Sequence, residues 1–377
     1  MPQLVVIAEQ LLAEVPGGTG RYSRELTVAL ARAAPPNWSV STVVARHADP
    51  GAAVIAGVEG PRVLPLSRRA LIAAWDRGVP LWPGGDAVHA PTPLAPAQPR
   101  RRRSLVVTVH DAVPWTQPET LTDRGAAWHR RVITRAARNA SALVVPTAAV
   151  AAELSRYAPG MARVHVVGEG VTEELVREPD EQQSLAVAQR LGLPPRYLLT
   201  VGTIEPRKGL DVLLTALAKP HAPNLPLVLV GQQGWGGVDP KRLAAQVGLP
   251  QQRLLVLGKI SDADLAVVLH RATALVAPSL AEGFGLPVVE AMAAGVPVVH
   301  SDAPALMEVV GGAGVMVKRR DPMSLASGLR TVLADETRTA TLVAAGRRRA
   351  ARYTWQRAAR EIWRIHTELY QANRGLV

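Results

Sequence analysis

The chain has 377 residues, a formal net charge of +12 and no cysteine. Its length predicts two α/β domains rather than one core, and the lack of cysteine excludes disulfides, thiolate metal sites and a cysteine nucleophile. No apolar run approaches the roughly 18 residues that a transmembrane helix needs. Residues 1–8 lack a basic region and enter a strand-like run at once, so we expect no signal peptide and a cytoplasmic protein.

Arginine supplies most of the positive charge, and four arginines stand in a row at Arg100–Arg103. Such a run is typical of a nucleic-acid site, of a surface that contacts anionic membranes, or of a solvated loop. Nucleic acid is the least favoured partner, because the chain has one Phe and five Tyr and shows no stacking motif or zinc module. A peripheral contact with the inner face of the membrane stays open.

In the first half, strand-like runs alternate with longer helix-like segments, which predicts a parallel, doubly wound sheet. The first predicted helix follows Pro16–Gly20, where successive glycines, Gly18 among them, allow the backbone to approach a phosphate or a sugar. The segment is not a dinucleotide fingerprint, because it lies about ten residues past the strand and Ser23 replaces the third glycine. A flexible loop without a ligand is the alternative.

The apolar strand predicted at 105–109 ends in His110 and Asp111. Parallel sheets bind ligands at the carboxyl ends of their strands, so we expect His110 to face the mouth of a crevice rather than the core. A lone histidine is more often structural than catalytic. Its place at the end of a strand is what makes His110 a candidate.

The polar stretch 178–184 loses the apolar periodicity and predicts a linker, and a strand at 197–201 opens the second domain. This strand leads into Gly202–Gly209, where Arg207 and Lys208 stand side by side before a helix. Two adjacent cations at a helix start can clamp a diphosphate. The alternative is a solvated pair that caps the loop.

Two glutamates, Glu282 and Glu290, flank an apolar, glycine-bearing segment that follows a predicted strand at 274–278. A helix is predicted from Pro287 to a stop at Gly295, which puts Glu282 at the edge of the sheet and Glu290 about one turn into the helix. Carboxylates accept hydrogen bonds from hydroxyls, and free N–H groups at a helix start bind polar oxygens. The segment therefore predicts a site for a polyhydroxylated ligand.

Other acidic residues do not predict a metal site. Asp262 and Asp264 imitate a metal-binding pair, but Ser261 before them indicates a helix cap. No spacing of histidines and carboxylates predicts zinc, and there is no nucleophile elbow. Further strands are predicted at 227–230, 254–257 and 296–299, and a long final helix at 355–370.

In these segments the chain resembles the retaining glycosyltransferases of family 4, which have the GT-B fold. The resemblance covers nearly the whole chain and rests on residues 16–20, 108–111, 201–209 and 282–290. It implies two Rossmann-like doubly wound domains that face each other across a cleft. Residues 1–180 would bind the acceptor, residues 181–354 the nucleotide-sugar, and a C-terminal helix at 355–377 would pack back on the first domain.

The resemblance also implies a role for each matched residue. Arg207 and Lys208 would hold the diphosphate and stabilise the leaving nucleoside diphosphate. Glu290 would accept from the ribose hydroxyls, and His110 would bond the sugar near the reacting carbon. Glu282, with the backbone of Gly283, Phe284, Gly285 and Leu286, would grip the transferred sugar. Gly18 would approach the phosphates, and Lys259 and Ile260 would flank the base. Gly202 would also belong to the donor site. Of all these, His110, Arg207, Lys208 and Glu282 would be catalytic.

The reaction implied is a metal-independent transfer with retention, on one face of the sugar and with the leaving phosphate as base. Similarity to bacterial α-mannosyltransferases favours GDP-mannose as the donor. A UDP-sugar donor, a nucleotide-sugar epimerase and a non-enzymatic basic surface-binding protein stay open. The sequence does not determine the acceptor, which could be a polysaccharide, a glycolipid or a small glycoside. Nor does it determine the oligomeric state, or whether Arg100–Arg103 contact membrane or acceptor.

Overall fold

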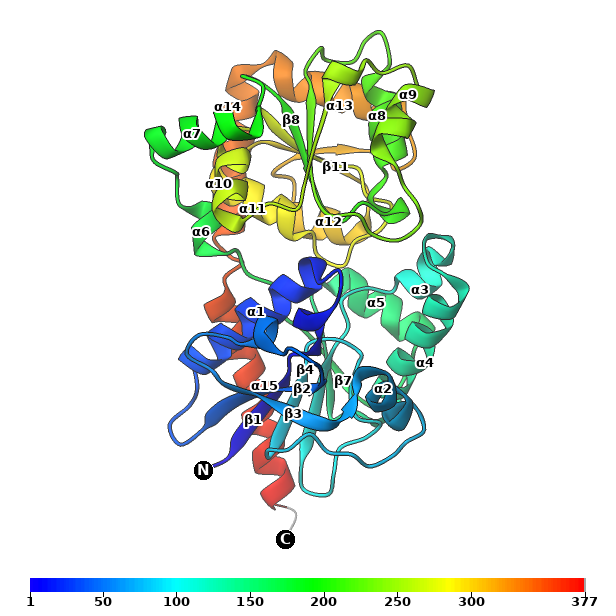
Figure 1. Ribbon diagram of the computed structural model, residues 1–377, viewed down its shortest axis with the longest axis vertical. Coiled ribbons are helices and arrows are strands. Elements are labelled where there is room, and N and C mark those ends of the chain that lie inside the picture. Colours follow the sequence, from blue (N-terminus) through cyan, green and yellow to red (C-terminus); the bar gives the residue numbers. More distant parts are fainter. Residues whose placement is uncertain (376–377) are drawn as a thin grey trace. The chain divides into compact units, whose positions relative to one another are not determined.

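The computed structural model describes residues 1–375, which divide into two compact units (Figure 1). The first unit comprises Met1–Thr116, Asp123–Gly170 and the residues from Thr354 onward, and the second comprises Gln117–Thr122 and Val171–Tyr353. Each unit contains one parallel sheet, with seven strands in the first and six in the second. The predicted pair of Rossmann-like α/β domains is confirmed.

The first sheet has the order β3-β2-β1-β4-β5-β6-β7, and all its pairings are parallel. Every residue of β4, β5 and β6 is buried, as expected for central strands covered by helices on both faces. The strands are β1 (Gln3–Ile7), β2 (Ser39–Arg46), β3 (Glu59–Ser67), β4 (Ala87–Ala90), β5 (Ser104–Thr108), β6 (Ala142–Val145) and β7 (Arg163–Val166). The helices are α1 (Gly17–Arg32), α2 (Arg68–Asp76), α3 (Val113–Thr116), α4 (Asp123–Asn139), α5 (Ala148–Tyr157) and α15 (Trp355–Gly375), with short 3-10 turns η1 (Glu9–Leu12) and η2 (Gly51–Ala53).

The C-terminal helix α15 packs on α1 of the first unit, as expected for a helix that crosses back. Buried Trp363 donates its indole N–H to the carbonyl of Leu30 in α1 at 2.9 Å. Where the chain re-enters this unit, Trp355 lies against Gly170, and a Cβ on that glycine would stand 2.3 Å from the backbone nitrogen of Trp355. Only glycine permits the two crossing segments to approach so closely.

The second sheet has the order β10-β9-β8-β11-β12-β13 and is also parallel throughout. Helices α8, α9 and α13 pack together on one face, and α6, α10 and α11 on the other (Figure 1). The strands are β8 (Leu198–Val201), β9 (Leu227–Val230), β10 (Leu254–Gly258), β11 (Ala274–Ala277), β12 (Val298–Ser301) and β13 (Val315–Val317). The helices are α6 (Glu173–Val176), α7 (Glu181–Leu191), α8 (Leu210–Leu217), α9 (Pro240–Gln246), α10 (Asp262–His270), α11 (Leu286–Ala294), α12 (Pro304–Val310), α13 (Pro322–Ala334) and α14 (Glu336–Ala350), with 3-10 turns η3 (Pro118–Thr120), η4 (Pro206–Lys208) and η5 (Gln251–Arg253).

The strand order of each sheet reverses at one point. In the first sheet the chain leaves β1 for β2 and β3 on one side and returns to β4 on the other. In the second sheet β8 is flanked by β9 and by β11 in the same way. Open α/β sheets bind ligands outside the carboxyl ends of the strands at such a switch point. The loops that follow β1, β4, β8 and β11 are therefore the places to look for a site.

The division into units differs from the predicted boundaries. Residues 171–180, expected in the first domain, belong to the second unit, because α6 packs on α10 and α11. Residues 117–122 join the second unit as well. The expected linker at 178–184 contains the start of α7, whose N-cap Asp180 accepts a hydrogen bond from the backbone N–H of Gln183. The stretch is polar because the start of α7 is exposed, so it lacks the apolar residues that would show the helical period of 3.6.

No helix in residues 1–375 is long and apolar enough to cross a membrane.

Candidate functional site

The candidate site of the second unit lies at the switch point between the neighbouring strands β8 and β11. Strand β8 leads through Gly202 into η4, which carries Arg207 and Lys208, and β11 leads to Glu282 and α11. A backbone hydrogen bond of 2.8 Å from Leu280 N–H to the Arg207 carbonyl joins the two loops. Segments 75 residues apart in the sequence thus meet at one edge of the sheet.

Gly209 makes this approach possible. It has a φ of 64°, in the left-handed region, and a Cβ there would stand 2.5 Å from the carbonyl oxygen of Pro278 in the β11 loop. A larger residue would push the cation-bearing turn away from the acidic loop, because the atom it meets is backbone and cannot turn aside.

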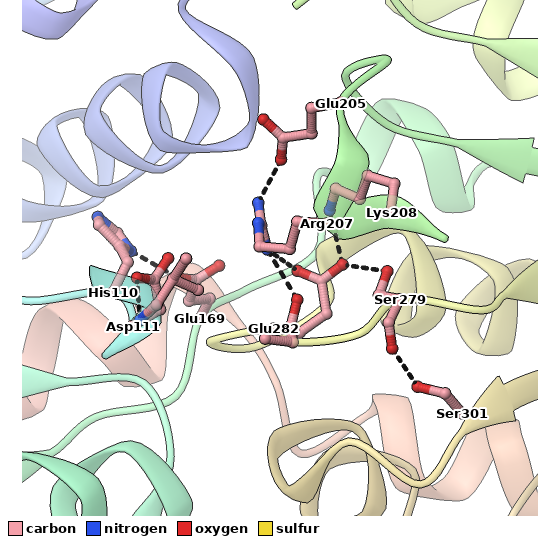
Figure 2. Close-up of polar contacts among 11 residues, drawn as sticks. His110, Asp111, Glu169, Glu205, Arg207, Lys208, Ser279, Glu282 and Ser301 are labelled. Carbon is pink, nitrogen blue, oxygen red and sulfur yellow. Dashed lines mark hydrogen bonds and ion pairs between the residues drawn. The ribbon is translucent and has the colours of Figure 1, made fainter. Parts of the chain in front are cut away.

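Five side chains form what we call the Glu282 cluster: Glu205, Arg207, Lys208, Ser279 and Glu282 (Figure 2). Glu282 Oε1 accepts from Lys208 Nζ at 2.6 Å and from Ser279 Oγ at 2.7 Å, while Oε2 accepts from Arg207 Nη1 at 3.0 Å. Arg207 Nη2 donates to Glu205 Oε1 at 2.7 Å. The charged side chains of the cluster are 11–19% exposed, so solvent screens these pairs only weakly.

The cluster holds Glu282 in its charged form. Burial on its own would raise the pKa of Glu282, but the charges of Lys208 and Arg207 and the hydrogen bonds from Lys208 and Ser279 outweigh it. The pKa falls from its ordinary 4.5 to about 2. Two cations and two carboxylates therefore face one another at neutral pH, and their formal charges cancel before any ligand binds.

Sequence reasoning named Arg207, Lys208 and Glu282 but missed Ser279 and gave Glu205 no role. Ser279 is 3% exposed, and its own carbonyl accepts a 2.6 Å hydrogen bond from the hydroxyl of Ser301, which ends β12. The signal for Ser279 was its place as the first polar residue after β11. The signal for Glu205 was its place two residues before an arginine in a glycine-bounded loop.

The segment between the two glutamates buries its one aromatic side chain. The N-cap of α11 is Gly285, with a φ of 97°, so α11 begins at Leu286. Phe284 is buried, and its ring packs edge-on against Tyr353 at 5.1 Å between centroids. Glu290 lies one turn into α11, as expected, and is 3% exposed.

Two cavities border the Glu282 cluster. One, of about 20 Å³, is lined by Gly202, Lys208 and Glu282 among others, and has room for about one water molecule. The other, of about 380 Å³, is bordered by Glu205 and by the loop that precedes α9. Its size lies in the range of small-molecule pockets. Lys259 and Ile260 follow β10 at the same edge of the sheet and do not line either cavity.

The acidic pair at the start of α10 belongs to a helix cap, as predicted. Ser261 is the N-cap and its hydroxyl accepts from the backbone N–H of Asp264, whose carboxylate also pairs with Arg190.

In the first unit, His110 follows β5 at the carboxyl edge of the sheet and is 17% exposed. Its Nδ1 lies 3.2 Å from Glu169 Oε1 (Figure 2). Its Nε2 lies 2.9 Å from the carbonyl oxygen of Pro91, which follows β4. Burial on its own would lower the pKa of His110, but the hydrogen bond and charge of Glu169 outweigh it and raise the pKa above its ordinary value. Sequence reasoning missed Glu169, whose signal was an acid just past β7.

The glycine segment after β1 differs from the predicted loop, because α1 already begins at Gly17 and Pro16 is its N-cap. Gly18 is exposed in the first turn, where helical N–H groups lack partners inside the helix. A Cβ on Gly20 would stand 2.5 Å from the Cβ of Pro16, so that glycine serves packing. Gly18 and His110 belong to the first unit, and all the other predicted site residues to the second.

Two family models match the chain: "Glycosyltransferase Family 4" over residues 16–175 and "Glycosyl transferases group 1" over residues 164–349. O-antigen chain mannosyltransferase B of Escherichia coli is 36% identical over 163 residues, 42% of each chain. D-inositol 3-phosphate glycosyltransferase 1 of Catenulispora acidiphila is 34% identical over 251 residues, 63% of this chain and 59% of that one. Phosphatidyl-myo-inositol mannosyltransferase of Mycobacterium tuberculosis is 37% identical over 196 residues, 48% of this chain and 50% of that one. The chain spans about half the length of the curated relatives it matches.

Solved structures share the fold over almost the whole chain. A sucrose-phosphate synthase from Thermosynechococcus elongatus has a TM-score of 0.77 at 23% identity, covering 99% of this chain and 100% of that one. The Anabaena protein HepE, in complex with UDP and glucose, has a TM-score of 0.75 at 21% identity, covering 98% and 100%. These likenesses show the architecture that both units adopt.

Proposed function

Because the chain belongs to the family 4 glycosyltransferases of the GT-B fold, we propose that it transfers a hexose from a nucleotide-sugar to a carbohydrate or glycolipid acceptor. The observation that supports this most directly is the Glu282 cluster at the switch point between β8 and β11. It places two cations and an ionised carboxylate where an open α/β sheet binds its ligand.

In this proposal, the diphosphate of the donor replaces the Glu282 carboxylate as the partner of Arg207 and Lys208. The exchange is favourable because a diphosphate offers more charge and more acceptor oxygens than one carboxylate. Glu282, released from the cations, accepts hydrogen bonds from hydroxyls of the transferred sugar. The cavity of about 380 Å³ that Glu205 borders in the same unit has the size of a small-molecule pocket, but Glu282 does not line it.

The cations would then carry the catalysis. Breaking the bond between the anomeric carbon and the phosphate oxygen leaves negative charge on the diphosphate and positive charge on the sugar. Arg207 and Lys208 stabilise the first of these more in the transition state than in the ground state, which accelerates the step. Fixed side-chain cations could take the place of a metal ion at the leaving group, so we expect no essential metal.

For the donor we propose GDP-mannose, because two of the relatives above carry the name mannosyltransferase. A UDP-sugar is the second candidate, since HepE was solved with UDP and glucose. We further propose that the sugar retains its anomeric configuration, as in the retaining family 4 enzymes that the sequence resembles, with the acceptor attacking the face that the diphosphate leaves and a phosphate oxygen taking the proton of the acceptor. An epimerase would convert the donor without an acceptor, and the same incubation distinguishes it.

The test is incubation of the purified protein with GDP-mannose, UDP-glucose or UDP-N-acetylglucosamine and a panel of acceptors, read by mass spectrometry and by the anomeric NMR signal. Arg207→Ala and Lys208→Ala should each lower turnover by about 10²–10³, the usual effect of losing one preorganised electrostatic donor. Lys241→Ala, on the exposed face of α9, is the matched control and should change nothing. Near-normal turnover in folded Lys208→Ala would contradict the assignment of the cations, and no product from any donor would contradict the function.

Thermal shift with GDP, UDP and ADP checks the base independently. The preferred nucleotide should raise the apparent stability by RT ln(1 + [L]/Kd), about 2.7 kcal/mol at a hundredfold excess over Kd.

A further inference from the structure

His110 is held between a carbonyl oxygen and a carboxyl oxygen. On one side Nε2 points to the carbonyl oxygen of Pro91 at 2.9 Å, and on the other Nδ1 points to Glu169 Oε1 at 3.2 Å. Glu169 is 4% exposed and lies in the segment after β7. The segments that follow β4, β5 and β7 therefore each contribute one of the three residues. Both ring nitrogens are therefore committed within the first unit.

The two partners fix the protons of the ring. A carbonyl oxygen cannot donate, so Nε2 must carry a proton. One further proton is then shared between Nδ1 and Glu169, either on the imidazole beside a carboxylate or on the acid beside a neutral ring. Neither arrangement leaves a ring nitrogen with a free lone pair. His110 in this geometry cannot remove a proton from a substrate hydroxyl.

The surroundings favour the imidazolium beside the carboxylate. Tyr22 of α1 packs edge-on against the ring at 4.6 Å between centroids, and burial raises the pKa of its phenol, so it faces His110 uncharged. His89 of β4 is fully buried, and burial lowers its pKa to about 3, so it adds no positive charge. Asp111, the next residue, adds negative charge and favours the same form. On the side of α15, burial lowers the pKa of His366 well below its ordinary value, so it stays neutral too.

We propose that Glu169 is a positioning residue for glycosyl transfer, which fixes the proton and the orientation of the His110 imidazole. The inference rests on the proposed function, because it concerns the hydrogen bond that His110 gives to a sugar. The imidazolium of His110 then serves as a charged hydrogen-bond donor, whose Nε2–H a sugar hydroxyl can share with the Pro91 carbonyl, and never as a general base. A histidine oriented by a carboxylate in this way gains both the correct tautomer and a stable ring angle.

Two variants separate the charge of Glu169 from its packing. Glu169→Gln keeps the size and can still donate its amide N–H to Nδ1, but it removes the charge that retains the second proton. Glu169→Ala removes both. Glu14→Gln replaces an exposed acid of the same unit and is the matched control.

The first readout is NMR titration of the histidine side chains, with the His110 signals assigned from a His110→Gln protein. The midpoint of His110 should fall in Glu169→Gln and be unchanged in Glu14→Gln. The second readout is the pH profile of kcat/KM with the nucleotide-sugar that the wild type turns over. In Glu169→Gln the alkaline limb should move to lower pH and kcat/KM should fall about ten- to a hundredfold, as when a partner that orients an imidazole is lost. Binding of the free nucleoside diphosphate should not change.

Each result decides the proposal. An unchanged His110 midpoint in Glu169→Gln would overturn the pairing, whatever the activity. A shifted midpoint with an unchanged pH profile would overturn the positioning role, because a purely structural pair moves only the first readout. A wild type that transfers no sugar would end the proposed function and the positioning role together, while the titration would still decide the pairing.

Discussion

Removing the charge of Glu282 should weaken the second unit in a way that depends on pH. The perturbation is Glu282→Gln, which keeps the shape of the side chain and leaves Arg207 and Lys208 without their shared carboxylate. Because Gln resembles the protonated acid, the cost of the substitution equals the stabilisation that ionised Glu282 gains in the folded state. That gain is set by the difference between its folded and unfolded pKa.

The magnitude follows from the lowered pKa. A fall from 4.5 to about 2 corresponds to about 3 kcal/mol of unfolding free energy at pH 7. A carboxyl group whose folded pKa is depressed contributes its full stabilisation above the unfolded pKa and loses it as the pH falls through the folded pKa. At pH 3, between the two values, about 1.5 kcal/mol should remain.

The assay is urea unfolding at pH 7 and pH 3, with hydrogen exchange of peptides from β8 and β11 to assign the change to the second unit. Wild type minus Glu282→Gln should give about 3 kcal/mol at pH 7 and about half of that at pH 3. Glu178→Gln, an exposed acid between α6 and α7, is the control and should stay within about 0.5 kcal/mol at both values. A cost below about 1 kcal/mol at pH 7, or one independent of pH, would refute the reasoning.

Three further outcomes are expected. Gly209→Ala should lower the unfolding free energy, measured in urea, by about 1–3 kcal/mol more than Gly192→Ala. Both glycines have a φ near 64°, but only at Gly209 would the added Cβ meet a backbone atom, the Pro278 carbonyl oxygen. Equal costs would contradict the close approach of the two loops. Trp363→Ala should lower the unfolding free energy of the first unit by about 3–5 kcal/mol, because it empties a buried site. Trp363→Phe should lower it by about 1 kcal/mol, because it loses the hydrogen bond to Leu30. Both are measured by hydrogen exchange in α1, and no effect there would mean that α15 does not stabilise this unit. If the exposed Arg100–Arg102 contact anionic membranes, their replacement with Gln should weaken cosedimentation with anionic vesicles about a hundredfold. Arg103 is not replaced, because it pairs with Asp86. Unchanged binding would exclude the contact.

The sequence predicted most of the fold because its signals are local. Apolar runs marked strands such as β5, β8 and β11 within a residue or two. The same reasoning failed at 178–184, where an exposed helix start resembles a linker. It also failed at Pro16–Gly20, where the glycines suggest a loop but form the first turn of α1.

What the sequence determined by itself is the chemistry available at each strand end: Arg207 and Lys208 after one strand, Glu282 after another, His110 after a third. What only the tertiary structure decided is which of these groups meet. The strand order makes β8 and β11 neighbours, so the cations find Glu282, and it brings β4 and β7 to either side of β5 and β6, so His110 finds Pro91 and Glu169. Contacts between residues 59 to 75 positions apart depend on the pairing of whole strands, and no local pattern encodes that pairing.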